Sequence, residues 1–425
     1  MPGIYIHIPF CKSRCDYCAF YSTVSAEEIR HSYVQRLCEE VRERKDFFGS
    51  PDVSSVYLGG GTPSRLSIEE IRMIFDALCH CFHIMSDAEI TMEVNPDDIT
   101  QEYATALREF PINRISMGVQ SFNDKLLCAI HRRHSGMEAV KSYNILRESG
   151  FGNISIDLIY ALPRQSLPLW ENDLDFAVSL RPEHISAYAL SFEEGTPLYK
   201  KLQKGDIKES EEELYINMYG MLVEKLKIAG YEHYEISNFS LPGKRARHNS
   251  SYWTGEKYLG LGAGAHSFNG VSRRINFQDV IKYIESEDVP CETEILTSAN
   301  KYDEMVMTRL RTCEGINLED VKRQFGDEAE SFLMRSAKSY MESGKLETVS
   351  TPGGMFLKLT ENGVFVSDEI ISDLMNPDLK MPIWRNRSGT PRPTDGVFRR
   401  LHGVCCKNFP NCCFPIPTFL FPRGL

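Results

Sequence analysis

The chain contains no long hydrophobic run. Its apolar stretches fall short of the ~20 residues that a membrane helix needs. Its first residues lack the basic region, apolar stretch and cleavage site of a secretory leader, so we expect a cytoplasmic protein. Positive charge is also scarce, since 48 Lys and Arg stand against 59 Asp and Glu, giving a net charge of −11. This balance disfavours phosphate contacts, and no nucleic-acid partner is expected.

The 425 residues include 13 cysteines, but no set of disulfides is expected. Disulfide frameworks belong to small secreted chains, not to a cytoplasmic protein of this size. Six of the cysteines are scattered singly or nearly so and are by default buried thiols: Cys38, Cys79, Cys81, Cys128, Cys291 and Cys313. Three others form a C-x₃-C-x₂-C array, Cys11, Cys15 and Cys18, directly after an apolar run.

This array predicts an iron–sulfur cluster, because thiolate is a soft ligand that suits such clusters. A four-iron cluster normally takes four thiolates. Three thiolates in one short loop therefore leave one iron of a [4Fe-4S] cluster open to a small molecule. A zinc knuckle, or a disulfide with a spare thiol, draws on the same residue type and stays open as an alternative.

Short apolar segments alternate with amphipathic stretches along the first half of the chain. Strands are expected at 3–9, 54–58, 88–94, 113–119, 153–159 and 184–190. Helices are expected near 27–46, 67–81, 100–110, 123–149 (broken), 168–180 and 209–229, with a capping box at Ser67 and Glu70. Six strand–helix alternations imply parallel strands with helical crossovers, and six units favour an open, partial barrel.

The second half of the chain has a different composition. Residues 231–239 are strand-like, and the Gly, Asn, Ser and aromatic content of 243–270 predicts loops that line a site. A helix–turn–helix pattern followed by a hairpin across Thr351–Gly354 resembles an acidic winged helix, suited to packing or partner binding rather than DNA. The proline-rich end, with Cys405, Cys406, Cys412 and Cys413, predicts a disordered tail without a function. The predicted domains are a barrel at 1–240, a connecting region at 241–299, a winged-helix-like domain at 300–376 and the tail at 377–425.

The cysteine spacing and its flank, Tyr-Ile-His-Ile-Pro-Phe-Cys at 5–11, resemble the radical S-adenosylmethionine (SAM) superfamily. Within it, they are similar to the branch of oxygen-independent coproporphyrinogen III oxidase and the heme chaperone HemW. The resemblance implies an α/β fold, a partial (βα)6 TIM-like radical SAM barrel with a C-terminal α+β domain. It also implies SAM bound beside the [4Fe-4S] cluster.

Several residues at successive strand ends match positions that contact SAM in the resembling family. Glycines after a strand let the backbone approach a ligand closely, and a carboxylate within an apolar strand is costly unless it is paired or bound. The residues carried over are Tyr5, Tyr17, Gly60, Gly61, Thr62, Glu93, Gln120, Arg132 and Asp157.

Two absences and one motif distinguish the branches. Phe20 stands where the oxidases carry a fourth cysteine, and Cys11 is too near the start for their N-terminal extension. The run from His248 to Trp253 matches the HNxxYW motif of the heme chaperones at His248, Asn249, Tyr252 and Trp253. A neutral imidazole is a good heme-iron ligand, and the two aromatic residues offer flat apolar surface with polar edges. Alternatively, the His-Asn pair satisfies backbone groups and the aromatics belong to the core; His7 and His266 are secondary candidate ligands.

The resemblance therefore implies a heme chaperone. It would bind heme, the cluster and SAM, and deliver heme to apo-hemoproteins, respiratory ones included, with the cluster serving transfer or dimerisation. An electron donor is implied, a homodimer is compatible, and coproporphyrinogen dehydrogenase activity is not expected. Two alternatives stay open: an oxygen-independent coproporphyrinogen III oxidase-like radical SAM oxidoreductase of porphyrin biosynthesis, and a zinc-bearing interaction protein.

Overall fold

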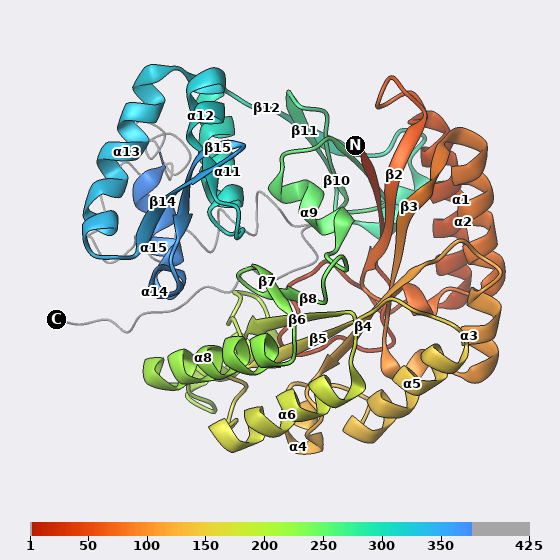
Figure 1. Cartoon of the computed structure of the whole chain (residues 1–425). Coiled ribbons are helices and arrows are strands. Elements are labelled where there is room, and N and C mark those ends of the chain that lie inside the picture. Colours follow the sequence, from red (N-terminus) through yellow and green to blue (C-terminus); the bar gives the residue numbers. More distant parts are fainter. Residues whose placement is uncertain (1, 376–425) are drawn as a thin grey trace.

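A computed structural model describes residues 2–375, which form two sheets with helices packed against them (Figure 1). The larger sheet has twelve strands and the smaller has three. The predicted disordered tail at 377–425, with its four cysteines, lies outside the described residues.

Six parallel strands, neighbours in sequence order, form the centre of the larger sheet. They are β1 (Gly3–Ile8), β2 (Asp52–Gly60), β3 (His83–Val94), β4 (Arg114–Gln120), β5 (Ile154–Tyr160) and β6 (His184–Ala189). The crossover helices are α1 (Glu27–Glu43), α2 (Ile68–Cys81), α3 (Gln101–Leu107), α4 (Asp124–Ala129), α5 (Gly136–Glu148) and α6 (Leu167–Leu180), with short 3-10 turns at Pro63–Arg65 and Pro96–Asp98. These helices cover the outer face of the curved sheet (Figure 1), and most residues of the six strands are buried. The predicted partial (βα)6 barrel is confirmed.

Short-range sequence signals predicted where two of the helices begin or break. The hydroxyl oxygen of Ser67 accepts from the backbone N–H of Glu70 at 3.2 Å, and the Glu70 carboxylate accepts from the backbone N–H of Ser67 at 2.8 Å. This is the predicted capping box. The expected break within 123–149 is the gap between α4 and α5.

The sheet extends beyond the six strands on both sides. After α7 (Pro197–Lys204) and α8 (Glu212–Ile228), the run at 231–239 forms a hairpin of β7 (Glu232–Glu235) and β8 (Asn238–Ser240), and β8 pairs with β6. On the other side, β9 (Tyr258–Leu261) pairs in parallel with β1 and is followed by β10 (His266–Phe268), β11 (Ser272–Asn276), α10 (Val280–Glu285) and β12 (Cys291–Ile295). The expectation of loops at 243–270 was therefore wrong in part, since this segment forms α9 (Arg247–Trp253), β9 and β10. An unpaired edge of β1 would leave backbone groups unsatisfied, and β9 supplies their partners.

The C-terminal residues build a smaller unit around the three-stranded sheet. Its elements are α11 (Ser298–Arg309), β13 (Ile316–Asn317), α12 (Leu318–Phe325), α13 (Asp327–Glu342), β14 (Leu346–Thr351), β15 (Gly354–Leu359), α14 (Glu361–Val364) and α15 (Ser367–Leu374). The hairpin closes with Thr351 opposite Gly354, as predicted. The core of this unit also includes Tyr252, Trp253 and Tyr258 from the preceding segment. The residue boundaries assigned to the domains stay predictions.

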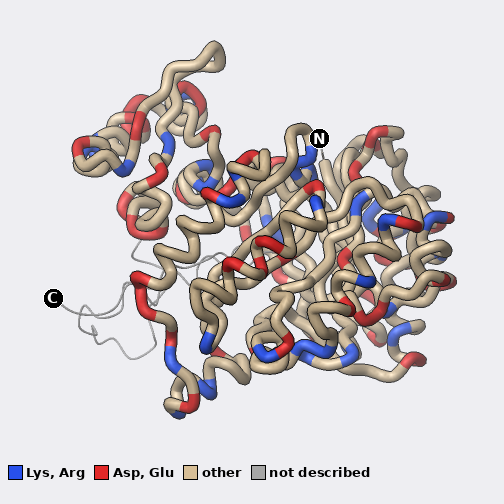
Figure 2. The backbone as a smooth tube through the Cα atoms, turned by 60° about the horizontal axis from the view of Figure 1, so that its bottom comes forward, with Lys and Arg blue, Asp and Glu red and all other residues tan. Residues whose placement is uncertain are grey.

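Acidic and basic positions are interspersed along the backbone of the helices and loops (Figure 2). Within residues 2–375, no helix combines the length and the apolar character that crossing a bilayer requires.

A buried carboxylate joins the β9–α10 segment to the barrel. Glu40 on α1 is fully buried and accepts from the backbone N–H of Gly262 at 2.7 Å, the hydroxyl of Tyr283 at 2.8 Å and the amide of Asn276 at 2.9 Å. The guanidinium of Arg44 lies 3.6 Å away. One side chain therefore satisfies donors from three elements that follow it by more than 200 positions.

We expect Glu40→Ala to lower the free energy of unfolding by about 3 kcal/mol, because buried donors lose their acceptor. Glu39→Ala is the matched control, since this neighbouring side chain is 60% exposed and lies 3.7 Å from Arg36; its effect should stay within about 0.5 kcal/mol. Urea denaturation measures both, and equal effects would contradict the anchoring role.

Candidate functional site

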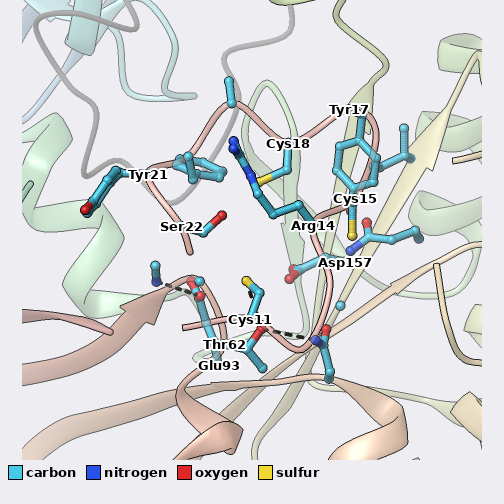
Figure 3. A pocket seen from close by; sticks show the side chains of 18 of the residues that line it. Cys11, Arg14, Cys15, Tyr17, Cys18, Tyr21, Ser22, Thr62, Glu93 and Asp157 are labelled. Atoms are coloured by element: carbon cyan, nitrogen blue, oxygen red, sulfur yellow. Dashed lines mark hydrogen bonds between the residues drawn. The ribbon is translucent and has the colours of Figure 1, made fainter. Parts of the chain in front are cut away.

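A cavity of about 240 Å³ lies over the carboxyl ends of the parallel strands. Parallel strands bring their following loops together at this end. Cys11, Cys15 and Cys18 surround one space, which Glu93 and Asp157 border (Figure 3). All nine residues predicted to contact SAM also line this cavity: Tyr5, Tyr17, Gly60, Gly61, Thr62, Glu93, Gln120, Arg132 and Asp157.

The cysteine loop between β1 and α1 has little regular structure and is held by tertiary hydrogen bonds. The backbone N–H of Cys11 donates to the carbonyl of Thr23 at 2.9 Å, and the carbonyl of Asp16 accepts from the N–H of Leu198 at 2.9 Å. The Asp16 carboxylate also pairs with Lys201 at 2.6 Å. Residues up to 185 positions away thus help to fix the loop that carries the thiols.

A chain of hydrogen bonds connects two of the thiols to the barrel. The guanidinium of Arg132 donates to Cys15 Sγ at 3.5 Å and to Asn95 Oδ1 at 2.8 Å. Asn95 Nδ2 donates to Thr62 Oγ1 at 3.2 Å, and the Thr62 hydroxyl donates to Cys11 Sγ at 3.5 Å. Asn95 was not among the residues predicted to contact SAM, although its place two residues after Glu93, directly after β3, was a usable signal.

The thiols of Cys11 and Cys18 are protonated in the ligand-free protein at neutral pH. Burial raises the pKa of Cys11, and it raises the pKa of Cys18 to about 12. Coordination to a metal would have to displace these protons. Thiolates are the usual protein ligands of iron–sulfur clusters, and three thiols that line one cavity fit such a cluster.

The glycine loop after β2 packs tightly against the end of β1. A Cβ atom on Gly61 would lie 2.8 Å from the carbonyl carbon of Pro9, so a larger residue would push the loop away. The backbone N–H of Gly60, with φ of +115°, donates to Glu93 Oε2 at 3.1 Å. Glu93 Oε1 accepts from the hydroxyl of Tyr57 at 2.8 Å. The carboxylate thus holds the glycine loop in place and borders the cavity.

Asp157 carries a buried acceptor that protein groups leave unused. Its Oδ2 accepts from the Ser116 hydroxyl at 3.3 Å, while Oδ1 is buried with no hydrogen-bond partner in the described part of the chain. Burial outweighs the opposing effects of the Ser186 hydroxyl and of the Arg114 charge, and raises the pKa of Asp157 to about 6. On the neighbouring strand, a β-bulge puts Gln120 at φ of +66° beside the same cavity. An unfilled acceptor here fits a ligand with hydrogen-bond donors, such as SAM.

The predicted heme residues lie elsewhere, on α9 near the amino ends of the strands. The His248 side chain is fully buried, its Nδ1 is 2.9 Å from the hydroxyl of Ser55 on β2, and its Nε2 is 2.9 Å from the hydroxyl of Tyr252. Burial lowers the pKa of His248 to about 3, so the imidazole is neutral. Asn249 Oδ1 and Trp253 Nε1 are buried without hydrogen-bond partners among residues 2–375. The structure therefore separates this motif from the cysteine loop.

The two secondary candidates are also buried. His7 lines the cysteine cavity, with its ring nitrogens 3.0 Å from the hydroxyl of Tyr5 and 3.0 Å from the carbonyl of Tyr21. His266 lies on β10, and burial lowers its pKa to about 3.

A three-cysteine loop over the carboxyl end of a partial (βα)6 barrel is the arrangement of a radical SAM protein. The model of the radical SAM superfamily matches residues 5–177, and that of the HemN C-terminal domain matches residues 296–366. The chain is 33% identical over 375 residues to the heme chaperone HemW of Bacillus subtilis (strain 168), covering 87% of this chain and 98% of that protein. The chain therefore belongs to the HemN and HemW family of the radical SAM superfamily, which confirms the predicted family.

Two further similarities extend over most of the chain. Heme chaperone HemW of Lactococcus lactis subsp. lactis (strain IL1403) is 34% identical over 325 residues, or 76% of this chain and 84% of that protein. The solved structure of coproporphyrinogen III oxidase (HemN) from Escherichia coli, a radical SAM enzyme, matches with a TM-score of 0.76 over 88% of this chain and 90% of that chain. Its sequence identity is 23%, so the match supports the fold alone.

We expect Asp157→Asn to stabilise the ligand-free protein above pH 6 and to have little effect below about pH 4. The pKa of Asp157 is raised from 3.8 to about 6 on folding. The folded state therefore holds the proton more tightly than the unfolded state, and the ionised carboxylate costs stability as the pH rises through this window. The amide carries no such charge.

Thermal midpoints at pH 7.5 and pH 5.0 test this expectation, with a larger gain at pH 7.5. Asp76→Asn, at an exposed position on α2, is the matched control and should show no such pH dependence. An equal shift of Asp157→Asn at both pH values would refute the burial penalty.

Proposed function

We propose that this protein is a heme chaperone that binds heme and delivers it to apo-hemoproteins. The observation that carries the proposal is the similarity over most of the chain to relatives named heme chaperone HemW. The His248–Trp253 segment, which matches the HNxxYW motif, supports it. Phe20, at the position of a fourth cysteine in the oxidases, weighs against porphyrinogen oxidation. A cytoplasmic location, an electron donor, respiratory recipients and a homodimer stay predictions.

Cys11, Cys15 and Cys18 would hold a [4Fe-4S] cluster, and the cavity beside them would hold SAM. The chemistry that such a cluster supplies when bound is one-electron reduction of SAM. The protein's own contribution is positional. Glu93 holds the glycine loop near the thiols, and the unpaired oxygen of Asp157 offers an acceptor to the ligand.

His248 would ligate the heme iron after one of its hydrogen bonds opens. Its neutral imidazole has the correct protonation state for a metal ligand. Both ring nitrogens are engaged, by Ser55 and by Tyr252, so heme must displace one of these hydroxyls. Asn249 and Trp253 each bring a buried polar atom without a partner to the same helix, and such atoms in native proteins call for an explanation by water or a ligand.

We expect Cys18→Ser to abolish cluster assembly, because it removes one of three thiolate ligands. Anaerobic reconstitution followed by iron and acid-labile sulfide analysis measures the loss. Cys128→Ser, at an exposed cysteine on α4, should assemble the cluster like the wild type. Bound zinc without labile sulfide in the wild type would contradict the cluster and support the zinc alternative.

We expect the wild type to give a Soret shift on titration with hemin. His248→Ala should weaken hemin binding about tenfold or more, because losing an iron–ligand bond that contributes even ~1.4 kcal/mol gives this factor. Added imidazole should restore the spectrum of the variant by filling the vacated space. His31→Ala, on the exposed face of α1, is the control. An unchanged shift in a folded His248→Ala protein would exclude this ligand, and no shift in the wild type would defeat the chaperone proposal.

A further inference from the structure

Helix α9 has a second face that ligation by His248 does not use. His248 and Tyr252 are buried. In contrast, Arg247, Ser250 and Ser251 line a separate cavity of about 480 Å³. Pockets for drug-sized ligands occupy roughly 300–1,000 Å³, so this cavity is large enough to hold a substantial part of a ligand.

The cavity lies between the barrel and the C-terminal unit. Ser54 and Ser55 of β2 line it on the barrel side, and Arg309 of α11 lines it on the other. Ser55 is also the residue whose hydroxyl is 2.9 Å from His248 Nδ1. The His248 imidazole thus lies directly behind Ser55, a residue that lines the cavity.

Three arginines line this cavity, and they differ in whether a carboxylate lies at ion-pair distance. Arg245 is 2.7 Å from Glu314, and Arg247 is 3.6 Å from Asp87. Arg309 donates to the carbonyl of Thr254 at 3.1 Å. Among the described residues it has no carboxylate at ion-pair distance, and Asp320, Glu314 and Glu256 act on its charge from further away.

Burial lowers the pKa of Arg309, although carboxylates beyond ion-pair distance favour its charge. A partly desolvated guanidinium without a counter-ion is costly and favours an anionic ligand.

A second buried donor lies in the same wall. Trp253 lines the cavity, and its indole N–H has no hydrogen-bond partner among the described residues. Indole N–H groups usually find a partner when buried. Glu256 and Glu314 also line the cavity, so its lining holds three arginines and two carboxylates besides the aromatic ring and the donor without a hydrogen-bond partner. The excess of positive charge suits a flat apolar molecule with carboxylate groups.

We propose that this cavity binds the carboxylates of a tetrapyrrole, with Arg309 as the main ion-pair partner and Arg245 and Arg247 at the rim. The proposal rests on the heme binding proposed above and adds a recognition site to it. Guanidinium forms bidentate hydrogen bonds with carboxylate, which gives orientation as well as affinity. Ion pairs with these arginines would hold the macrocycle against the Ser55 side of the cavity, close to His248.

The test compares hemin with hemin dimethyl ester, whose propionates are uncharged, in Soret titrations of the full chain. The wild type should bind hemin about tenfold more tightly than the ester, because the uncharged ester groups lose their ion pair with a guanidinium. Arg309→Gln should weaken hemin binding by the same factor and leave ester binding unchanged. Arg72→Gln, on the exposed side of α2, should change neither.

The outcomes separate this proposal from the proposed function. Failure of the wild type to bind either compound overturns heme binding itself, and this inference with it. Equal binding of both compounds, with no effect of Arg309→Gln, overturns the carboxylate site alone. Displacement of hemin by an equal concentration of succinate would assign the cavity to small dicarboxylates instead.

A second variant guards against misfolding of Arg309→Gln. Arg247→Gln removes a rim cation whose side chain is 47% exposed, so its fold should be preserved. It should weaken hemin binding in the same direction, by a smaller factor, without affecting the ester. An effect on both compounds alike would contradict a contact with the propionates.

Discussion

The hydrogen-bond chain from Arg132 through Asn95 and Thr62 to Cys11 is the constraint on which the candidate metal centre depends. The cysteine loop has almost no secondary structure of its own, so the three thiols meet only because the loop is tied to the barrel. Arg132 also donates to Cys15, so one guanidinium positions two thiols. Its charge, partly buried in the cavity wall, favours the negative charge that a thiolate-bound cluster carries.

The barrel interior connects the two candidate sites. The ring of Tyr57 stacks on that of His248 with centroids 5.2 Å apart, and its hydroxyl donates to Glu93, which holds the glycine loop. Glu89, on the same strand as Glu93, accepts from the backbone N–H of His248 at 2.9 Å. Strand β3 therefore contributes a carboxylate to each site, and Tyr57 packs between them.

Much of the fold could be predicted because its signals are local. The six core strands read as apolar runs, and Ser67 with Glu70 marks a helix start through contacts three residues apart. The cavity could be predicted because residues at successive ends of parallel strands meet at one edge. Asn95 was not selected because only its position two residues after Glu93 marks it. Strand β9 was not predicted because it pairs with β1, far away in the sequence, and β10 pairs in turn with β9.

By itself, the sequence determined the alternation of strands and helices, the three-cysteine loop and the set of side chains at the strand ends, because each depends on residues close together along the chain. Only the tertiary structure decided that His248 lies buried against Ser55, 193 positions earlier, and that α9 lies near the amino ends of the strands, away from the cysteines. It also decided that Arg309 meets α9 across a cavity. These arrangements follow from long-range packing between the barrel and the C-terminal unit, and short-range sequence patterns do not record such packing.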